Sequence, residues 1–107
     1  MALKLETVSA TATLAGIRDS LRYQETLHFR LVSISTGLVG GQRANLVLFR
    51  NALGAPAVKP LELQDVDGAL PVDQQQAALN AAGFDVVCYG SLYVSGAARN
   101  IAARRQQ

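Results

Sequence analysis

The sequence has few of the residues on which metalloproteins, disulfide-rich domains and most enzymes depend. It contains one cysteine, one histidine and no tryptophan among 107 residues. A single cysteine, Cys88, cannot form an intrachain disulfide, so burial must hold the fold, as suits a reducing compartment. A metal site made of imidazole and thiolate ligands cannot be assembled from one histidine and one cysteine. We therefore expect no metal and no cofactor.

Long apolar runs and a large excess of charge are also missing. No stretch approaches the roughly 20 apolar residues of a membrane-spanning helix, and the first residues alternate charged with apolar side chains, unlike a signal peptide. The formal net charge is only +2. We expect a soluble cytoplasmic protein, or one incorporated into an assembly built in the cytoplasm, with no membrane partner.

What the sequence does contain is enough apolar surface for a core. Half of the residues are hydrophobic and 17% are charged, which excludes disorder of the whole chain. A length of 107 residues suits one domain. We predict a single domain over residues 1–95 and a short basic tail, helical or frayed, over residues 96–107. No internal repeat or linker is evident.

Charges of opposite sign alternate in blocks along the chain. Residues 1–50 hold six bases and three acids, residues 51–95 hold one base and five acids, and residues 96–107 hold three arginines and no acid. The bases are not clustered with aromatic residues, which argues against a nucleic-acid partner. Blocks of opposite sign suit contacts between copies of one chain. Ordinary solvated charges are the alternative interpretation.

Hydrophobic periodicity predicts seven regular elements. Two-residue alternation or Val- and Tyr-rich composition predicts strands over residues 2–12, 26–35, 44–50, 58–64 and 84–94. Apolar residues three and four apart predict a helix over 13–24 that is capped by Thr13. An alanine-rich run predicts a second helix over 74–82, with Asp73 as its N-cap and Gly83 as its end.

The connections complete this prediction. Residues 36–43 contain three glycines and predict a flexible loop, whereas residues 44–50 and 58–64 predict a hairpin whose second strand, with Pro60, lies at a sheet edge. The alternation changes phase within residues 26–35, which indicates a bulge or a strand covered on both faces. The uncharged run 84–94 indicates an interior strand.

This order of elements predicts an α+β fold. It is a small two-layer sandwich in which two helices cover one face of a mainly antiparallel sheet, βαββαβ-like with one extra strand. Val32, Ile34, Val86 and Val87 put apolar side chains on both sides of their strands. The open sheet face therefore needs a cover, which another subunit could supply.

The residues with reactive side chains do not form a recognisable catalytic set. His28 is the only imidazole, and strand alternation places it on the solvent side, away from Leu27 and Phe29. Cys88 could act as a nucleophile with His28 as its base, but apolar neighbours predict a buried thiol with a high pKa. We predict no catalytic residues and no enzymatic activity.

Two loops resemble binding motifs only in part. Asp65, Asp67 and Asp73 with Gly68 do not have the spacing of an EF-hand, so turn formation and helix capping are the ordinary interpretation, with a loose surface cation site as the alternative. Residues 37–43 lack the Lys-Ser/Thr ending of a P-loop. A mobile loop is the preferred interpretation, and a phosphate cradle is the alternative.

The hypothesis that these observations favour is a non-enzymatic structural or adaptor subunit. It would act by self-association or by docking into a larger assembly, such as a virion or a secretion apparatus. Its partners would be copies of itself or another protein of that assembly. The alternative is a module that binds a small anion or nucleotide through the glycine-rich loop 37–43. The interface or ligand candidates are Gly40, Gly41, Arg43, Tyr89, Tyr93, Arg99, Arg104 and Arg105.

Overall fold

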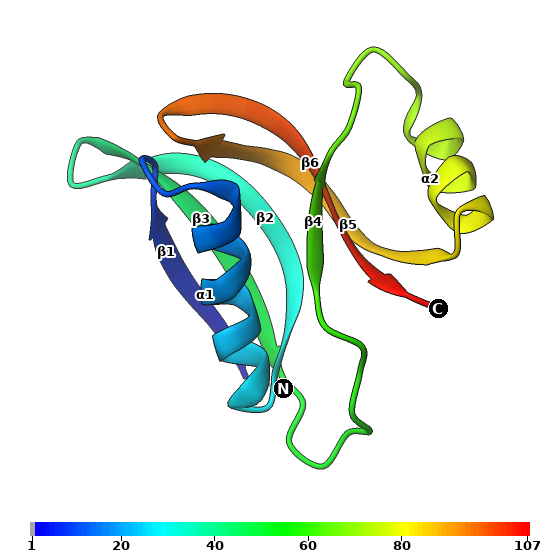
Figure 1. Ribbon diagram of the computed structural model, residues 1–107. Coiled ribbons are helices and arrows are strands. Elements are labelled where there is room, and N and C mark those ends of the chain that lie inside the picture. The colour runs from blue at the N-terminus through cyan, green and yellow to red at the C-terminus, as the bar shows by residue number, and fades with distance from the viewer. Residues whose placement is uncertain (1) are drawn as a thin grey trace.

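The computed structural model describes residues 2–107 and contains two three-stranded antiparallel sheets with one helix each (Figure 1). The first sheet has the order β1-β3-β2 and consists of β1 (Leu3–Ser9), β2 (Phe29–Val39) and β3 (Gln42–Asn51). The second has the order β4-β6-β5 and consists of β4 (Glu62–Asp65), β5 (Phe84–Val94) and β6 (Ala97–Gln106). Helix α1 (Leu14–Thr26) connects β1 to β2, and helix α2 (Val72–Ala81) connects β4 to β5. The predicted α+β class is confirmed, with the strands divided between two sheets.

The two halves of the chain repeat one βαββ unit. The β2–β3 hairpin and the β5–β6 hairpin have the same register, because Phe29 pairs with Asn51 and Phe84, 55 residues later, pairs with Gln106. Each hairpin has a bulge at the same position, after Leu31 and after Val86. The expectation of no internal repeat is therefore wrong. The identical pairs in the two hairpins are Phe29 and Phe84, Val32 and Val87, Val39 and Val94, Gly41 and Gly96, Asn45 and Asn100, and Arg50 and Arg105.

The first strand and the helix of each unit also correspond. Leu5 pairs with Leu48 on β3, and Leu63, 58 residues later, pairs with the equivalent Ala103 on β6. The same offset relates the N-cap positions Thr13 and Pro71. It also relates the buried helix residues, which are Ile17 and Leu21 in α1 and Gln75 and Leu79 in α2.

Local chemistry explains the helix ends. The Thr13 side chain accepts a hydrogen bond from the backbone N–H of Gly16 at 3.1 Å, as its N-cap assignment predicts. The predicted N-cap Asp73 is wrong, since Pro71 occupies that position without a side-chain hydrogen bond. Proline suits a helix start because its fixed φ costs little there. Gly83 follows α2 with φ +95°, which confirms its left-handed conformation.

The predicted flexible loop over 36–43 is wrong. Strand β2 continues to Val39, and only Gly40 and Gly41 turn the chain into β3, with φ values of +59° and +80°. Two successive positive φ values are typical of a type I′ turn, which matches the twist of the flanking strands. Ser95 and Gly96 form the equivalent turn of the β5–β6 hairpin, with φ values of +51° and +85°.

Three further predictions of elements are wrong. Residues 58–64 form no hairpin with 44–50, because β4 pairs with β6 in the second sheet. The predicted basic tail over 96–107 contains β6, the central strand of that sheet. The predicted interior strand β5 lies at a sheet edge, and its apolar residues pack against the first sheet. The predicted bulge in β2 is confirmed after Leu31.

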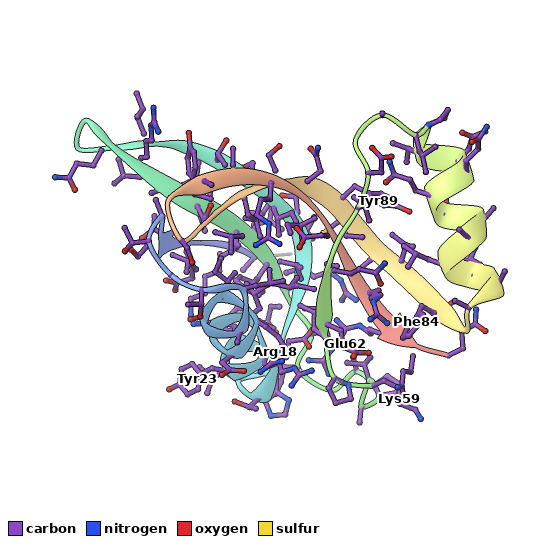
Figure 2. The ribbon with its side chains drawn as sticks, turned by 45° about the horizontal axis from the view of Figure 1, so that its top comes forward. Arg18, Tyr23, Lys59, Glu62, Phe84 and Tyr89 are labelled. Atoms are coloured by element: carbon purple, nitrogen blue, oxygen red, sulfur yellow. The ribbon has the colours of Figure 1, made fainter. Side chains whose placement is uncertain are left out.

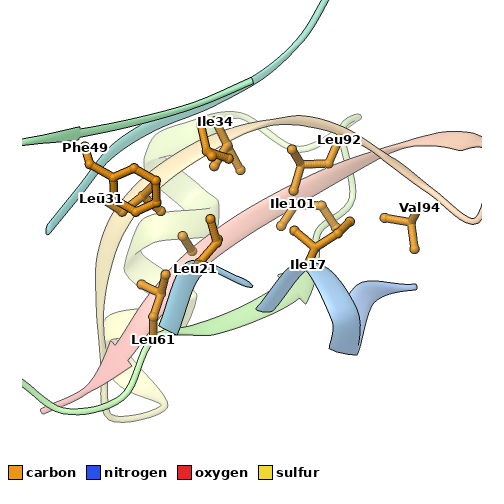
Figure 3. Packing of buried hydrophobic residues seen from close by; sticks show 11 residues of the cluster. Ile17, Leu21, Leu31, Ile34, Phe49, Leu61, Leu92, Val94 and Ile101 are labelled. Atoms are coloured by element: carbon orange, nitrogen blue, oxygen red, sulfur yellow. The ribbon is translucent and has the colours of Figure 1, made fainter. Parts of the chain in front are cut away.

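The core lies between α1 and the two sheets (Figure 3). Ile17 and Leu21 of α1 are fully buried and pack with Phe49 of the first sheet and Leu92 and Ile101 of the second. The side chains of the core cluster are Ile17, Leu21, Leu31, Ile34, Val47, Phe49, Leu61, Leu92, Val94, Ile101 and Ala103. Helix α2 covers the other face of the second sheet and buries only Gln75 and Leu79 (Figure 1).

Candidate functional site

The face of the first sheet that points away from α1 carries exposed leucines. We call this surface the front; its residues are Leu3, Leu5, Thr7 and Ser9 of β1, Ser33, Ser35 and Gly37 of β2, and Ala44, Leu46, Leu48 and Arg50 of β3. Leu3 and Leu5 are 60% and 62% exposed, and Leu46 and Leu48 lie half-buried beside them. A sheet face with leucines at its centre is an unusual surface to leave in water.

The equivalent face of the second sheet is part of the core. Leu61, at the position equivalent to Leu3, is fully buried, and Leu63, equivalent to Leu5, packs against the core. Ile101 and Ala103, which are equivalent to Leu46 and Leu48, are also fully buried. The same positions are therefore apolar in both halves of the chain, but only those of the second half have a cover.

At the opposite end of the molecule, α2 covers the second sheet but buries only two of its own side chains, Gln75 and Leu79. We call this surface the back; it is the α2 side of the second sheet with the loop that leads into α2, and it includes Gly68, Leu70, Tyr89, Ser91 and Asn100. These residues line a cleft of about 240 Å³. Figure 2 shows Phe84 and Tyr89 on this side of the sheet.

Two polar side chains on the back are incompletely paired. The buried hydroxyl of Tyr89 and the buried Nε and Nη1 atoms of Arg104 have no hydrogen-bond partner within residues 2–107. Arg104 lies 3.6 Å above the centre of the Phe84 ring, and its Nη1 is 3.7 Å from a carboxylate oxygen of Glu62. Burial also raises the pKa of Tyr89. The unpaired polar atoms and the cleft make the back a candidate binding surface.

The three C-terminal arginines do not form one basic patch. Arg99 forms an ion pair with Asp65 at the surface, and Arg104 lies beside Glu62. Arg105 forms an ion pair with Glu25 of α1, in which its Nη1 donates to a Glu25 oxygen at 2.8 Å. The sequence reasoning missed these pairs, because the three acids lie 34 to 80 residues away from their partners in the chain.

The other predicted candidates divide between the two hairpins. Gly40 and Gly41 lie at the exposed tip of the β2–β3 hairpin. The Arg43 guanidinium lies 5.6 Å from the centre of the Tyr93 ring, so the structure brings these two together. Tyr89 and Tyr93 lie on the same face of β5, as alternation predicts, but only Tyr89 lines the cleft beside α2.

His28 and Cys88 occupy different environments. His28 lies in the turn between α1 and β2 with φ +66°, at the position equivalent to Gly83. It is exposed, so the predicted solvent-facing position is confirmed, but its predicted place on a strand is wrong. Cys88 packs against the core. Burial raises the pKa of its thiol from 9.0 to about 11, although a backbone hydrogen bond with Ile34 and the charge of Arg105 act in the opposite direction. The predicted high pKa is confirmed, and such a thiol is a poor nucleophile at neutral pH.

A second cleft, of about 510 Å³, lies where α1 ends and the chain leaves β3. Its charged and titratable lining residues are Arg22, Glu25, His28 and Arg30, and an apolar wall of Ala55, Ala57, Val58 and Pro60 faces them. Arg30 is only 8% exposed; its Nη1 donates to the backbone carbonyls of Glu25 and Phe29, whereas its Nε has no partner among the residues that the structure describes. No sequence pattern predicts this cleft, because its basic residues come from a helix, a turn and a strand.

Residues 2–107 contain no group of three or more His, Cys, Asp or Glu side chains arranged to hold a metal ion. Neither α1 nor α2 is long and apolar enough to cross a membrane. No protein-family model, curated protein or solved structure matches the chain significantly.

Proposed function

We propose that this chain is a non-enzymatic structural subunit that works by self-association, and that the front binds a second copy of the chain. The observation that carries the proposal is the difference between the two halves of the repeat. In the first half, Leu3 and Leu5 are exposed and Leu46 and Leu48 are half-buried, whereas Leu61, Leu63, Ile101 and Ala103 at the equivalent positions of the second half pack in or against the core. A second copy can offer the front the same kind of cover.

The exposed leucines of the front contribute to association. Burying a whole leucine side chain is worth about 1.5 to 3 kcal/mol, so covering the exposed parts of Leu3 and Leu5 is worth about 1 to 2 kcal/mol each. Leu46 and Leu48 add part of that amount. Association costs about 4 to 15 kcal/mol in lost translational and rotational entropy, so polar contacts between the copies must supply the rest.

The chemistry of the reactive side chains supports a role without catalysis. The thiol of Cys88 has a raised pKa and packs against the core, whereas His28 lines a cleft at the end of α1. A nucleophile and its base must lie within hydrogen-bond reach in order to act together. A virion or a secretion apparatus is the kind of assembly in which we place this subunit.

The mass of the protein in solution tests the proposal. We expect the wild-type chain to sediment as a multimer, and we expect Leu5→Asp combined with Leu48→Asp to sediment as a folded monomer. Leu53→Asp is the matched control, because Leu53 is 75% exposed and lies outside the front. A wild-type chain that stays monomeric at high concentration, or a double variant with the wild-type mass, would overturn the proposal.

The cleft beside His28 supports a second candidate function, which is binding of a small organic anion. Arg22 and Arg30 supply positive charge, and the apolar wall suits the body of a carboxylate or a phosphate ester. This site differs from the glycine-rich loop 37–43 of the sequence-based alternative. Thermal stabilisation by inorganic phosphate and by small carboxylates tests both sites: loss in Arg22→Gln supports the cleft, loss in Arg43→Gln supports the loop, and no stabilisation of the wild type excludes both.

A further inference from the structure

We infer that the front of one copy binds the back of the next, and that this contact repeats the joint between the two halves of a single chain. The inference rests on the proposed self-association and adds which surface of the second copy the front contacts. Inside the chain, the core face of the second sheet, which carries Leu61, Ile101 and Ala103, packs on α1 and on the first sheet. We call the side of the first sheet that faces α1 its inner face. The front is equivalent to that core face. The back is equivalent to the inner face and α1.

A buried asparagine closes the internal joint. Asn45 of β3 is fully buried; its Oδ1 accepts from the backbone N–H of Tyr93 at 2.7 Å, and its Nδ2 donates to the Tyr93 carbonyl at 2.8 Å. The side-chain amide thereby pairs with both backbone groups at the free edge of β5. We call this arrangement the amide clasp.

The second half of the chain contains an identical residue whose side chain makes no such pair within residues 2–107. Asn100 occupies the position of Asn45, is exposed, and lines the cleft of the back. Leu38 occupies the position of Tyr93, since Leu38 pairs with Arg43 as Tyr93 pairs with Ala98. Alternation of hydrogen bonds in an antiparallel pair then directs the Leu38 N–H and C=O outward from β2. Asn100 of one copy can therefore clasp Leu38 of the next.

The hairpin turns supply a second set of contacts. Inside the chain, the backbone N–H groups of Ser95 and Gly96 each donate at 2.8 Å to a carbonyl, on Ala12 and Ala10 respectively. The equivalent donors are Gly40 and Gly41 of the β2–β3 turn. The equivalent acceptors are the carbonyls of Leu70 and Gly68 on the back. The predicted interface candidates Gly40 and Gly41 thus lie where this contact needs two free amides.

Charge and polarity agree with this pairing. The front and its hairpin expose Arg43 and Arg50, whereas the loop that leads into α2 exposes Asp67 and the first turn of α2 exposes Asp73. Opposite charges favour front-to-back contact and disfavour front-to-front contact. The back also has Gln75 where α1 has Ile17, so the contact between copies is more polar than the internal joint.

The contact is heterologous, since each copy uses two different surfaces. Every added copy leaves one free front and one free back, so growth continues until a ring closes or a helical filament forms. One contact geometry therefore generates an assembly larger than a dimer.

Complementation between two variants tests the direction of assembly. The front variant is Leu5→Asp with Leu48→Asp, and the back variant is Ser91→Arg with Asn100→Ala; Ser91 and Asn100 are both exposed. We expect each variant to be a folded monomer alone and the mixture to form a 1:1 dimer that does not grow. Gln74→Arg, at an exposed position on α2, is the control for an added arginine.

The outcomes separate this inference from the proposed function. A back variant that associates like the wild type, beside a monomeric front variant, would mean that fronts pair with each other; self-association would stand and the inference would fail. Two monomeric variants that form no dimer on mixing would also overturn the inference. A monomeric wild-type chain would overturn the proposed function itself. The single variant Asn100→Ala should weaken association about 10- to 100-fold, since it removes two hydrogen bonds.

Discussion

Replacing the two equivalent asparagines should have very different effects on stability. Asn45 and Asn100 are the same residue type at the same register position of two equivalent hairpins, and only their surroundings differ. Asn45→Ala removes the amide clasp from the interior of the chain. Asn100→Ala removes an exposed side chain whose only hydrogen bond, within the described part of the chain, is a contact of 3.5 Å with Ser91.

The contacts of each asparagine set the expected magnitudes. Asn45 makes two hydrogen bonds of 2.7 and 2.8 Å to Tyr93 and a weaker one of 3.4 Å to the Ser9 carbonyl. Loss of each good bond costs about 1 to 1.5 kcal/mol, and leaving the Tyr93 backbone groups unpaired adds to this, for a total of about 3 kcal/mol. Asn100→Ala should cost less than about 0.5 kcal/mol.

Urea unfolding measures both effects. Both substitutions are made in the monomeric Leu5→Asp, Leu48→Asp background, so that association does not contribute to the free energy of unfolding. With an m-value of about 1.5 kcal/mol/M, Asn45→Ala should lower the urea midpoint by about 2 M, and Asn100→Ala should leave it nearly unchanged. Equal shifts for the two variants would refute the assignment of Asn45 as the clasp that joins the halves.

Three further predictions concern other contacts of the fold, each measured by urea unfolding of the same monomeric background. Arg105→Met leaves Glu25 buried without its partner and should lower the free energy of unfolding by about 3 to 5 kcal/mol. Arg99→Ala, at the exposed ion pair with Asp65, should lower it by at most about 1 kcal/mol. Similar costs for the two variants would contradict the difference in burial between the two ion pairs. Gly90→Ala should cost about 3 kcal/mol, because the new Cβ would lie 2.3 Å from a backbone oxygen of β2, and a neutral result would contradict the close strand crossing. Folding raises the pKa of the Cys88 thiol from 9.0 to about 11, so the unfolded chain loses this proton at lower pH than the folded chain, and the free energy of unfolding should fall as the pH rises from 9 to 11. The Cys88→Ala variant should show a shallower fall over this range. An identical slope for the two proteins would contradict burial of the thiol.

Most predictions that depended on local chemistry were accurate, although the N-cap Asp73 and the flexible loop over 36–43 were wrong. The helix capped by Thr13, the strand over 44–50 and the glycine after α2 were predicted from side-chain spacing and from the conformations that single residues prefer. The bulge in β2 was also recognisable, since the alternation changes phase there. Such features depend on neighbours within a few residues, and those neighbours are visible in the sequence.

Predictions that depended on distant partners failed. Residues 97–106 contain three arginines and few large apolar residues, so their sequence indicates a tail, yet they form the central strand β6. The small alanines of β6 fit between the core and α2, and Arg104 and Arg105 find acidic partners on β4 and α1. The candidate site follows the same rule: the front was expected only as an uncovered sheet face, and its leucines could not be assigned to it before the register was known.

The sequence by itself determined the α+β composition, the positions of both helices, and the absence of the residue types that disulfides and imidazole–thiolate metal sites require. Those properties follow from composition and from periodicity within single elements. Only the tertiary structure decided that the two halves of the chain repeat one βαββ unit, that the first half covers the core face of the second, and that the first sheet keeps an uncovered apolar face. The physical reason is that burial is a property of pairs of surfaces: Leu3 and Leu61 are the same residue at equivalent positions, and what differs is whether another sheet lies against them.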